Sequence, residues 1–337
     1  DNGQWSYTLK GGRSAGDNSN TQFALLALWY ADRAGASVES KLFSRTLQYF
    51  LSTQNEDGGW GYSAKERSKS YGSMSATGLA AIVVCRSGLE GVRLEDEKAR
   101  RDPEVAKAAK WIENHLKVDC NPEANFKFRG GMREVRKEVT DSYWRFYWLW
   151  SLERAAAVAG IERFGERDWY AEGAARLLEE QRDNGSWVGS ETPFLATSFA
   201  VLTCAVGSST KAEPVATGTI ARALARCSST KAWLAQTPPA MGAVAGAFAP
   251  RRFFCFLISG VRKAQSGNGS WDRDLGKTAL GLYVLAHAGV ERDDPSAARA
   301  LRWILGNLGR PDTYGASLAV MALATLDREA HATRIAR

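Results

Sequence analysis

The chain has 337 residues, with 44 Lys and Arg against 37 Asp and Glu, and a formal net charge of +7. Hydrophobic residues make up 45% and charged residues 24%, the balance of a globular protein with a sizeable core. No apolar run reaches the roughly 18 residues that a membrane span needs. The basic residues are scattered, which disfavours a nucleic-acid partner. Five Cys without a CxxC pair do not indicate a disulfide framework.

Two kinds of segment with helical periodicity alternate along the chain. The apolar kind, with small residues and few charges, covers about 19–34, 73–87, 141–159, 194–206, 275–289 and 314–326. The amphipathic kind covers about 40–54, 103–117, 167–181, 251–265 and 296–308. Helices contacted on all sides are apolar all round, whereas helices with one face in solvent carry a charged stripe. The alternation therefore predicts an inner and an outer layer of helices.

Two stretches interrupt this alternation. Residues 119–140 are too polar for the core and too long for a simple connection between paired helices. Residues 208–250 are rich in Ala, Ser, Thr, Gly and Pro, and their three prolines exclude a continuous helix. We expect both stretches to be irregular insertions in a single domain that spans 1–337. The chain starts at Asp1 with a motif already half complete, so we expect further residues upstream, and the sequence does not indicate a compartment.

A short motif occurs three times: Gln, five residues and Trp, with Gly two positions before the Trp. Its copies lie at 54–60, 181–187 and 265–271, and Asn2-Gly3-Gln4-Trp5 matches the tail of a fourth. Each Gln ends a helical segment, where its amide is predicted to satisfy free carbonyls of the last turn. Each Gly follows in a tight turn, and each Trp is predicted to fold back over that turn. The motif is therefore predicted to be scaffold that joins consecutive helices.

This motif is similar to the QW repeat of the squalene cyclase and protein prenyltransferase superfamily. Residues 17–35, 58–82 and 151–187 more specifically resemble bacterial prenyltransferase/squalene oxidase repeat proteins, and the likeness covers most of 1–207. The resemblance implies an all-α fold, an α-α toroid of about six helix pairs around a central cavity, and an apolar isoprenoid ligand. It implies a fold more strongly than a reaction.

Residues where the inner helices begin are the site candidates, because helix N-termini give that end of the ring unpaired N–H groups and positive potential. Asp17 begins the first inner segment and Asp141 begins the third. Asp141 is the prospective acid and Asp17 a prospective ligand contact. Helix capping explains the same residues.

The segment 141–150 carries aromatic rings on every face of its predicted helix. Aromatic faces stabilise cations and stack on apolar ligands, so a polyene or a carbocation would need such a lining. The candidate ligand contacts are Tyr143, Trp144, Tyr147 and Trp148. Simple filling of the barrel explains the same rings.

Two mechanisms that the resemblance implies can be compared with the residues. For a terpene cyclase, the resemblance implies an acid in an Asp-any-Asp-Asp motif. The nearest match here is Asp272-Arg-Asp274, which is followed by Leu275 in place of the last Asp. Asp272 and Asp274 are acid candidates, or else a turn and a helix cap. For a protein prenyltransferase, the resemblance implies a zinc ion held by Asp, Cys and His from inner helices. The only cluster of these residue types in the sequence, at 115–120, follows an outer helix instead. No metal site and no cofactor motif is therefore expected.

Two functions remain open. One is a terpenoid-cyclase-like or prenyltransferase-like protein that binds an isoprenoid in an aromatic cavity. The alternative is a noncatalytic toroid that binds other proteins or the cell envelope. The apolar and basic segment 251–263 is compatible with peripheral membrane contact, and packing on the inner layer explains the same pattern.

Overall fold

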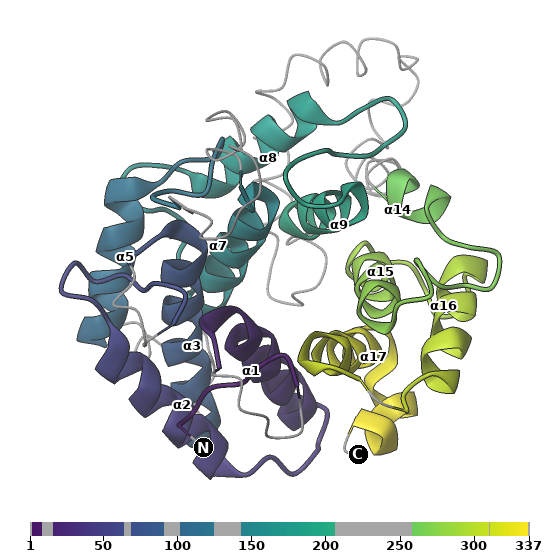
Figure 1. Ribbon diagram of the computed structural model, residues 1–337, viewed down its shortest axis with the longest axis horizontal. Coiled ribbons are helices and arrows are strands. Elements are labelled where there is room, and N and C mark those ends of the chain that lie inside the picture. Colours follow the sequence, from purple (N-terminus) through teal and green to yellow (C-terminus); the bar gives the residue numbers. More distant parts are fainter. Residues whose placement is uncertain are drawn as a thin grey trace, which may run out of the picture.

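The computed structural model describes residues 2–8, 16–63, 69–90, 102–124, 143–205, 258–309 and 311–335. These residues form eleven helices in two concentric layers (Figure 1). The inner helices are α1 (Asn18–Arg33), α3 (Gly72–Glu90), α7 (Arg145–Ala159), α9 (Pro193–Cys204), α15 (Leu275–His287) and α17 (Thr313–Ile335). The outer helices are α2 (Ser40–Thr53), α5 (Pro103–His115), α8 (Trp169–Glu180), α14 (Ser259–Lys263) and α16 (Pro295–Gly306). The predicted all-α fold with alternating inner and outer helices is confirmed.

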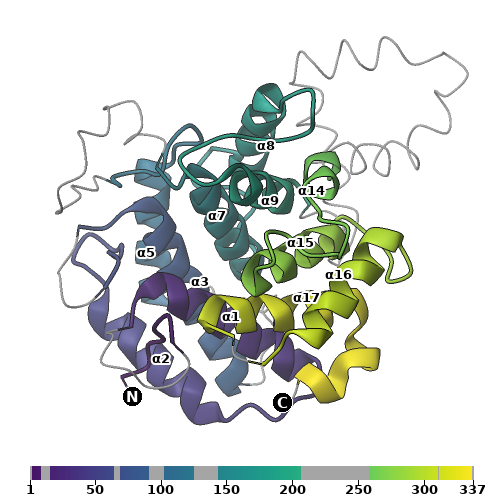
Figure 2. The same ribbon diagram turned by 45° about the vertical axis from the view of Figure 1, so that its right-hand side comes forward.

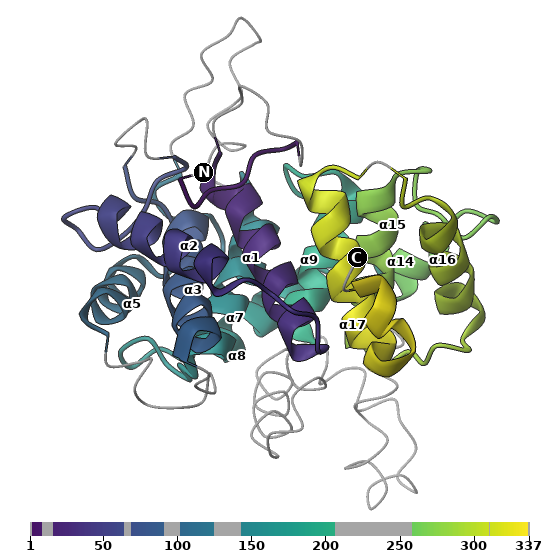
Figure 3. The same ribbon diagram turned by 90° about the horizontal axis from the view of Figure 1, so that it is seen from below.

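The inner helices close into a ring. Each packs on the next in the order α1, α3, α7, α9, α15, α17, and α17 returns to α1. Figures 2 and 3 show α1, near the start of the chain, and α17, at its end, lying side by side. There the backbone N–H of Thr313 donates to the carbonyl of Tyr7 at 3.2 Å. The ring is therefore closed by contacts between the first and last segments of the chain.

Burial explains the two kinds of helical segment. In α3, every residue from Gly72 to Cys85 is buried. In the outer helix α2, only Phe43, Thr46, Leu47, Tyr49 and Phe50 are buried. In the described part of the chain, no helix is long and apolar enough to cross a membrane. Of the two predicted insertions, 208–250 lies outside the described residues, and only 119–124 of the other lies within them.

The repeated tryptophans each close the last turn of the preceding outer helix. The indole N–H of Trp60 donates to Phe50 at 3.0 Å, that of Trp187 to Leu177 at 2.7 Å, and that of Trp271 to Val261 at 2.9 Å. All three acceptors are backbone carbonyls six or more residues before the turn glycine. Each tryptophan is at most 1% exposed, so the motif covers its turn as predicted.

The role predicted for the repeat glutamines was wrong in part. Gln54 does not cap its own helix: its Nε2 donates to the carbonyls of Gly58 and Glu104, both at 2.9 Å. Gln265 likewise donates to Gly269 at 3.0 Å and to Ser296 at 2.9 Å. Glu104 and Ser296 lie in the first turn of the next outer helix. The amide therefore links one outer helix to the next, and the tryptophan satisfies the carbonyl that the glutamine was expected to satisfy.

The N-terminal segment has the geometry of the motif's second half. The backbone N–H of Trp5 donates to the Thr21 hydroxyl at 3.0 Å, as that of Trp60 donates to Ser75 at 3.2 Å and that of Trp271 to Thr278 at 3.1 Å. Gly3 has φ +83°, and a Cβ there would come within 2.4 Å of a backbone carbonyl of α2. Only glycine fits such a turn without strain.

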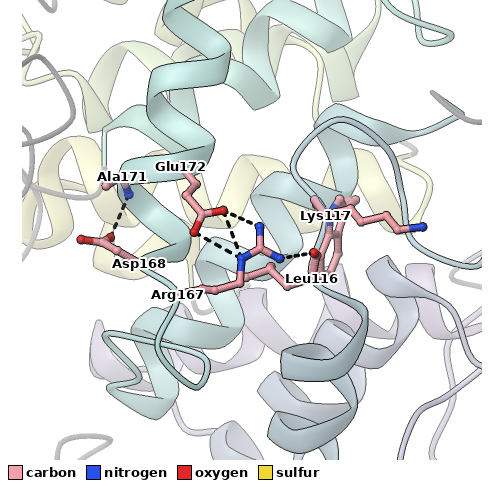
Figure 4. Close-up of polar contacts among 7 residues, drawn as sticks. Leu116, Lys117, Arg167, Asp168, Ala171 and Glu172 are labelled. Carbon is pink, nitrogen blue, oxygen red and sulfur yellow. Dashed lines mark hydrogen bonds and ion pairs between the residues drawn. The ribbon is translucent and has the colours of Figure 1, made fainter. Parts of the chain in front are cut away.

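Neighbouring outer elements are also joined through Arg167, which lies just before α8. Its guanidinium donates to the Leu116 carbonyl at the C-terminus of α5 and pairs with Glu172 in the first turn of α8 (Figure 4). Asp168 caps the same helix by accepting from the Ala171 N–H at 2.9 Å. One side chain thus satisfies a free helix-end carbonyl and ties α5 to α8.

Candidate functional site

Asp17 lies at the N-terminal end of the inner ring, which we call the mouth. It is the N-cap of α1, and its carboxylate accepts from the Asn20 backbone N–H and side-chain amide, both at 2.8 Å. The residue is only 4% exposed. Burial raises the pKa of Asp17, and hydrogen bonds from Asn20 and Tyr62 oppose this rise. The mouth therefore contains a buried carboxyl group whose pKa lies above its ordinary value.

Hydroxyl groups connect the mouth to the interior of the ring. The Ser19 hydroxyl lies 2.8 Å from that of Tyr314 and 3.0 Å from that of Tyr147. The Tyr147 hydroxyl in turn donates to Gln22 Oε1 at 2.6 Å. Ser19, Tyr147 and Tyr314 lie in the first turns of α1, α7 and α17, so these three helices begin at the same end of the ring. The chain of hydrogen bonds runs from the rim inward.

An aromatic cluster lies below these hydroxyls, formed by Phe23, Tyr147, Trp150, Phe199 and Tyr314. The Phe23 ring lies 5.0 Å from Trp150 and 4.9 Å from Tyr314, centroid to centroid. Phe199 lies 5.6 Å from Tyr147 and 5.4 Å from Trp150. Aromatic pairs at such distances are in contact. The rings come from α1, α7, α9 and α17, so they meet inside the ring and fill the space between these helices at this level.

A second buried carboxyl group, Glu191, lies between the starts of α7 and α9. It is 5% exposed and accepts from the Tyr147 backbone N–H at 3.4 Å. Ser190 next to it accepts from the Trp144 backbone N–H at 2.8 Å. Burial raises the pKa of Glu191, although backbone hydrogen bonds from its own N–H and from Tyr147 lower it. Asp17 and Glu191 are thus two buried carboxyl groups with raised pKa values at the rim of the ring.

The opposite end of the inner ring holds a buried ion pair on α7. Glu153 is fully buried and Arg154 is 9% exposed, and the guanidinium donates to the carboxylate through Nε and Nη2. The hydroxyls of Tyr30 and Tyr283 meet nearby at 3.1 Å. Burial, and then the Arg154 charge, lower the pKa of His287 to about 3. This end therefore holds buried, paired polar side chains.

The predicted aromatic helix begins later than expected. Tyr143 and Trp144 form a turn, Trp144 has a left-handed backbone with φ 54°, and α7 starts at Arg145. The prospective acid Asp141 lies outside the described residues. Tyr143 and Trp144 are half-buried at the rim, their rings 5.9 Å apart, and Tyr147 joins the aromatic cluster.

Trp148, a predicted ligand contact, lies on the side of α7 that faces the outer layer. Its ring is fully buried, and its Nε1 donates to the Lys117 carbonyl at 2.8 Å, beside the junction of α5 and α8 shown in Figure 4. One residue further along a helix turns the side chain by about 100°, so Tyr147 faces the interior whereas Trp148 faces the outer layer.

Asp272 and Asp274, which the sequence offered either as acids or as a turn and a helix cap, have the geometry of a turn and a cap. Asp274 is the N-cap of α15 and accepts from the Lys277 backbone N–H at 2.7 Å. Asp272 is exposed, has φ 54° and pairs with the Lys277 ammonium at 2.6 Å. Both carboxylates are exposed.

Among the described residues, no group of three or more His, Cys, Asp and Glu is placed to hold a metal ion. A polar cavity of about 650 Å³ lies on the outer side of the mouth, between α2 and α5. Its wall includes Asn55, Asp57 and Ser70, which hydrogen-bond to one another or to Trp111. Segment 251–257, part of the predicted membrane contact, lies outside the described residues.

Sequence reasoning missed Ser19, Gln22, Tyr62 and Glu191. Ser19 and Gln22 lie within an apolar helix and look like ordinary small or polar inner residues. Glu191 lies in the loop between α8 and α9. It contacts the N-terminal end of α7, which is distant in the sequence. One signal was present: Tyr7 and Tyr62 both stand two residues after a repeat tryptophan, and their hydroxyls meet at 3.1 Å over the mouth.

Comparison with known proteins supports the fold. No family model matches the sequence, and neither does any curated protein. A variant of the type II terpene cyclase MstE from Scytonema, in complex with geranylgeranyl dihydroxybenzoate as substrate, has a TM-score of 0.56 at 12% identity, over 96% of this chain and 92% of that chain. Another variant with merosterolic acid A as product gives 0.51 at 12% identity, over 91% and 73%.

A protein from Actinoplanes gives a TM-score of 0.52 at 16% identity, over 98% of this chain and 94% of that chain. At these identities the likeness concerns the fold and not the reaction. This chain has the all-α toroid fold of the type II terpene cyclases.

Proposed function

We propose that this protein binds an apolar isoprenoid at the mouth of its inner ring and that Asp17 starts a cyclisation by protonating an alkene of that ligand. The observation that carries the proposal is a buried carboxyl group with a raised pKa whose charge acts on Tyr147 and Tyr314 of the aromatic cluster. A neutral carboxylic acid is required for this step, because a carboxylate has no proton to give. Burial is the physical means by which a protein keeps one neutral.

The chemistry balances with the residues present. The Asp17 O–H would add its proton to one alkene carbon, the other carbon would become a carbocation, and Asp17 would be left as a carboxylate. Asn20 donates two hydrogen bonds to that carboxylate. Attack by a second alkene closes a ring, and loss of a proton to a base ends the sequence. The faces of Phe23, Tyr147 and Trp150 lie below and would stabilise the cation.

The toroid fold shared with enzymes that bind a geranylgeranyl substrate supports the proposal. Asp141 stays a second candidate for the acid, because it precedes the rim residue Tyr143 by two positions. The broader superfamily membership suggested by the repeat also remains a proposal.

A noncatalytic toroid is the second candidate function, and one observation favours it. The rings of Phe23, Trp150 and Phe199 contact one another, as they would in a barrel filled for stability. In that case the surface, and not the interior, would bind partners such as proteins or the cell envelope.

The test compares two substitutions at equivalent places in the repeat. Asp17 and Asp274 both cap an inner helix by accepting from the N–H three residues later. Asn caps a helix about as well as Asp, so Asp17→Asn and Asp274→Asn both preserve the helix start. Only Asp17→Asn removes a buried acid.

Each protein is incubated with squalene, farnesyl diphosphate and geranylgeranyl diphosphate, and extracted products are identified by gas chromatography and mass spectrometry. We expect the wild type and Asp274→Asn to form cyclic products. Asp17→Asn should be slower by a factor on the order of 100, a usual contribution of general acid catalysis. Full activity of Asp17→Asn would contradict the assignment of the acid. Absence of both turnover and isoprenoid binding in the wild type would favour the scaffold.

A further inference from the structure

Two tyrosine hydroxyls connect the buried carboxyl group of Asp17 to the surface. The Tyr62 hydroxyl donates a hydrogen bond to the Asp17 carboxylate, and it lies 3.1 Å from the hydroxyl of Tyr7. Along this chain the exposed fraction rises from 4% at Asp17 to 36% at Tyr62 and 51% at Tyr7. The hydrogen bonds therefore lead from a group that water hardly contacts to one that is open to water.

The direction of these hydrogen bonds follows from the number of protons. A tyrosine hydroxyl has one proton to donate, and its oxygen can also accept. While Asp17 is ionised it can only accept, so Tyr62 donates to it and the Tyr62 oxygen is left to accept from Tyr7. When Asp17 is protonated, the chain can run in the opposite direction. The two hydroxyls can thus pass a proton in either direction while the side chains stay in place.

Backbone hydrogen bonds fix both tyrosines at the mouth. The backbone N–H of Asn18 donates to the Tyr62 carbonyl at 2.9 Å, and that of Thr313 donates to the Tyr7 carbonyl at 3.2 Å. Asn18 lies in the first turn of α1 and Thr313 in the first turn of α17. The starts of two inner helices therefore hold the two hydroxyls at this end of the ring.

The two tyrosines are not part of the repeated scaffold. Both stand two positions after a repeat tryptophan, but the residues at that place in the other two copies are Gly189 and Arg273. Asp274, which caps its helix as Asp17 does, is exposed, so water reaches it directly. The hydroxyl pair therefore occurs at the junction where the capping carboxyl group is buried.

We propose that Tyr7 and Tyr62 form a relay that returns a proton from solvent to Asp17 after each reaction cycle. This inference rests on the proposed function, in which Asp17 gives its proton to an alkene and is left as a carboxylate. In the relay, the Tyr62 proton moves to an Asp17 oxygen, the Tyr7 proton moves to the Tyr62 oxygen, and a hydronium ion supplies a proton to the Tyr7 oxygen. Asp17 gains one proton, the solvent loses one, and both tyrosines end as neutral hydroxyls.

The two transfers between side chains are expected to be concerted. Burial raises the pKa of Tyr62, and the nearby Asp17 charge raises it further. A tyrosinate at this position is therefore unfavourable, so Tyr62 has to receive a proton as it gives one. Loss of the Tyr7 hydroxyl should accordingly stop the relay even though the bond between Tyr62 and Asp17 remains.

Burst kinetics test the relay, because the first cycle uses a proton that Asp17 already holds. Protein is mixed with an excess of whichever isoprenoid of the three named above the wild type converts, and product is followed by quenched flow. We expect the wild type to form product at a constant rate. Tyr7→Phe should form about one product per protein at the wild-type rate and then slow at least about tenfold. Water that enters in place of the hydroxyl keeps this loss below that expected for removal of the acid itself.

A second tyrosine pair provides the matched control. The hydroxyls of Tyr30 and Tyr283 also lie 3.1 Å apart, at the opposite end of the ring. Tyr30→Phe removes one hydroxyl of that pair and should leave every cycle at the wild-type rate. Tyr62→Phe breaks the relay next to Asp17 and should slow the later cycles at least as much as Tyr7→Phe does. Circular dichroism establishes that the three variants are folded.

The outcomes separate this inference from the proposed function. Steady turnover of Tyr7→Phe at the wild-type rate would overturn the relay and leave Asp17 as the acid. Equal slowing of the first and the later cycles would also overturn it, since Tyr7 would then act only by supporting the structure. Absence of product with the wild type would overturn both the relay and the proposed function.

Discussion

Asp17 occupies a position that recurs in the repeat but has an environment of its own. Asp274 and Asp312 cap inner helices with the same geometry, each accepting from the N–H three residues later. Both are exposed, whereas Asp17 is 4% exposed. Asp17 also accepts a hydrogen bond from Tyr62, which follows a different copy of the motif.

This burial predicts a pH dependence of stability. The folded pKa of Asp17 lies above its ordinary value near 3.8, so the folded state binds the proton more tightly than the unfolded state does. The stabilising contribution of the protonated group is complete below pH 3.8 and is lost as the pH rises through the folded pKa. Asp17→Asn carries no charge and escapes this loss.

We therefore expect the melting temperature of Asp17→Asn, relative to the wild type, to rise between pH 4 and pH 7. Asp17→Ser, which also caps helices without a charge, should show the same trend and controls for the amide. Thermal unfolding followed by circular dichroism measures both differences. If the melting temperature of Asp17→Asn instead falls relative to that of the wild type toward pH 7, the folded protein favours the ionised form of Asp17.

At the residue scale, the sequence predicted caps better than it predicted a site. Asp17, Asp272 and Asp274 all stand in patterns typical of helix starts, and capping is what Asp17 and Asp274 do. Which of them is buried depends on contacts made through the fold and not along the chain, such as the hydrogen bond from Tyr62 to Asp17. Glu191 could not be found for the same reason, because the end of α7 that covers it lies more than 40 residues away.

At the element scale, helical periodicity predicted the layers because inner and outer helices differ along their whole length. It failed at the start of α7, where Trp144 takes a left-handed conformation and its N–H is held by Ser190. It also gave no indication that Trp148 faces the outer layer, because aromatic residues on every face leave no periodic signal for the side that faces inward.

The buried ion pair of α7 allows a prediction about that helix. Arg154→Met would leave the Glu153 carboxylate buried without its partner. Removal of one member of such a pair costs about 3–5 kcal/mol, whereas replacing both by apolar residues is often neutral or stabilising. We expect Arg154→Met to lower the free energy of unfolding by about that amount, and Glu153→Met with Arg154→Met to recover most of it.

Urea unfolding of the wild type, the two single variants and the double variant completes the cycle. If the double variant loses as much stability as the sum of the single variants, the side chains of Glu153 and Arg154 do not stabilise each other, which contradicts the prediction.

At the scale of the whole molecule, the repeat determines the architecture. Each tryptophan closes an outer helix and hydrogen-bonds through its backbone to a Ser or Thr of the next inner helix. The half-copy at Trp5 does the same with Thr21, so the N-terminal segment belongs to the ring and meets Thr313 where the ring closes. The repeated motif predicted the junctions between helices, and its resemblance to the QW repeat predicted the toroid. It could not predict the content of the interior, because the motif residues face the junctions between helices.

The central claim is that an isoprenoid chain binds at the mouth of the inner ring, against the aromatic cluster, and photoaffinity labelling tests it most directly. A geranylgeranyl ether that carries a diazirine is irradiated with the protein, and the labelled residues are identified by mass spectrometry of peptides. The account predicts labels on Tyr147, Trp150 and Phe199 that excess geranylgeraniol suppresses. Labels confined to the outer helices, or labels that excess ligand does not suppress, would contradict it.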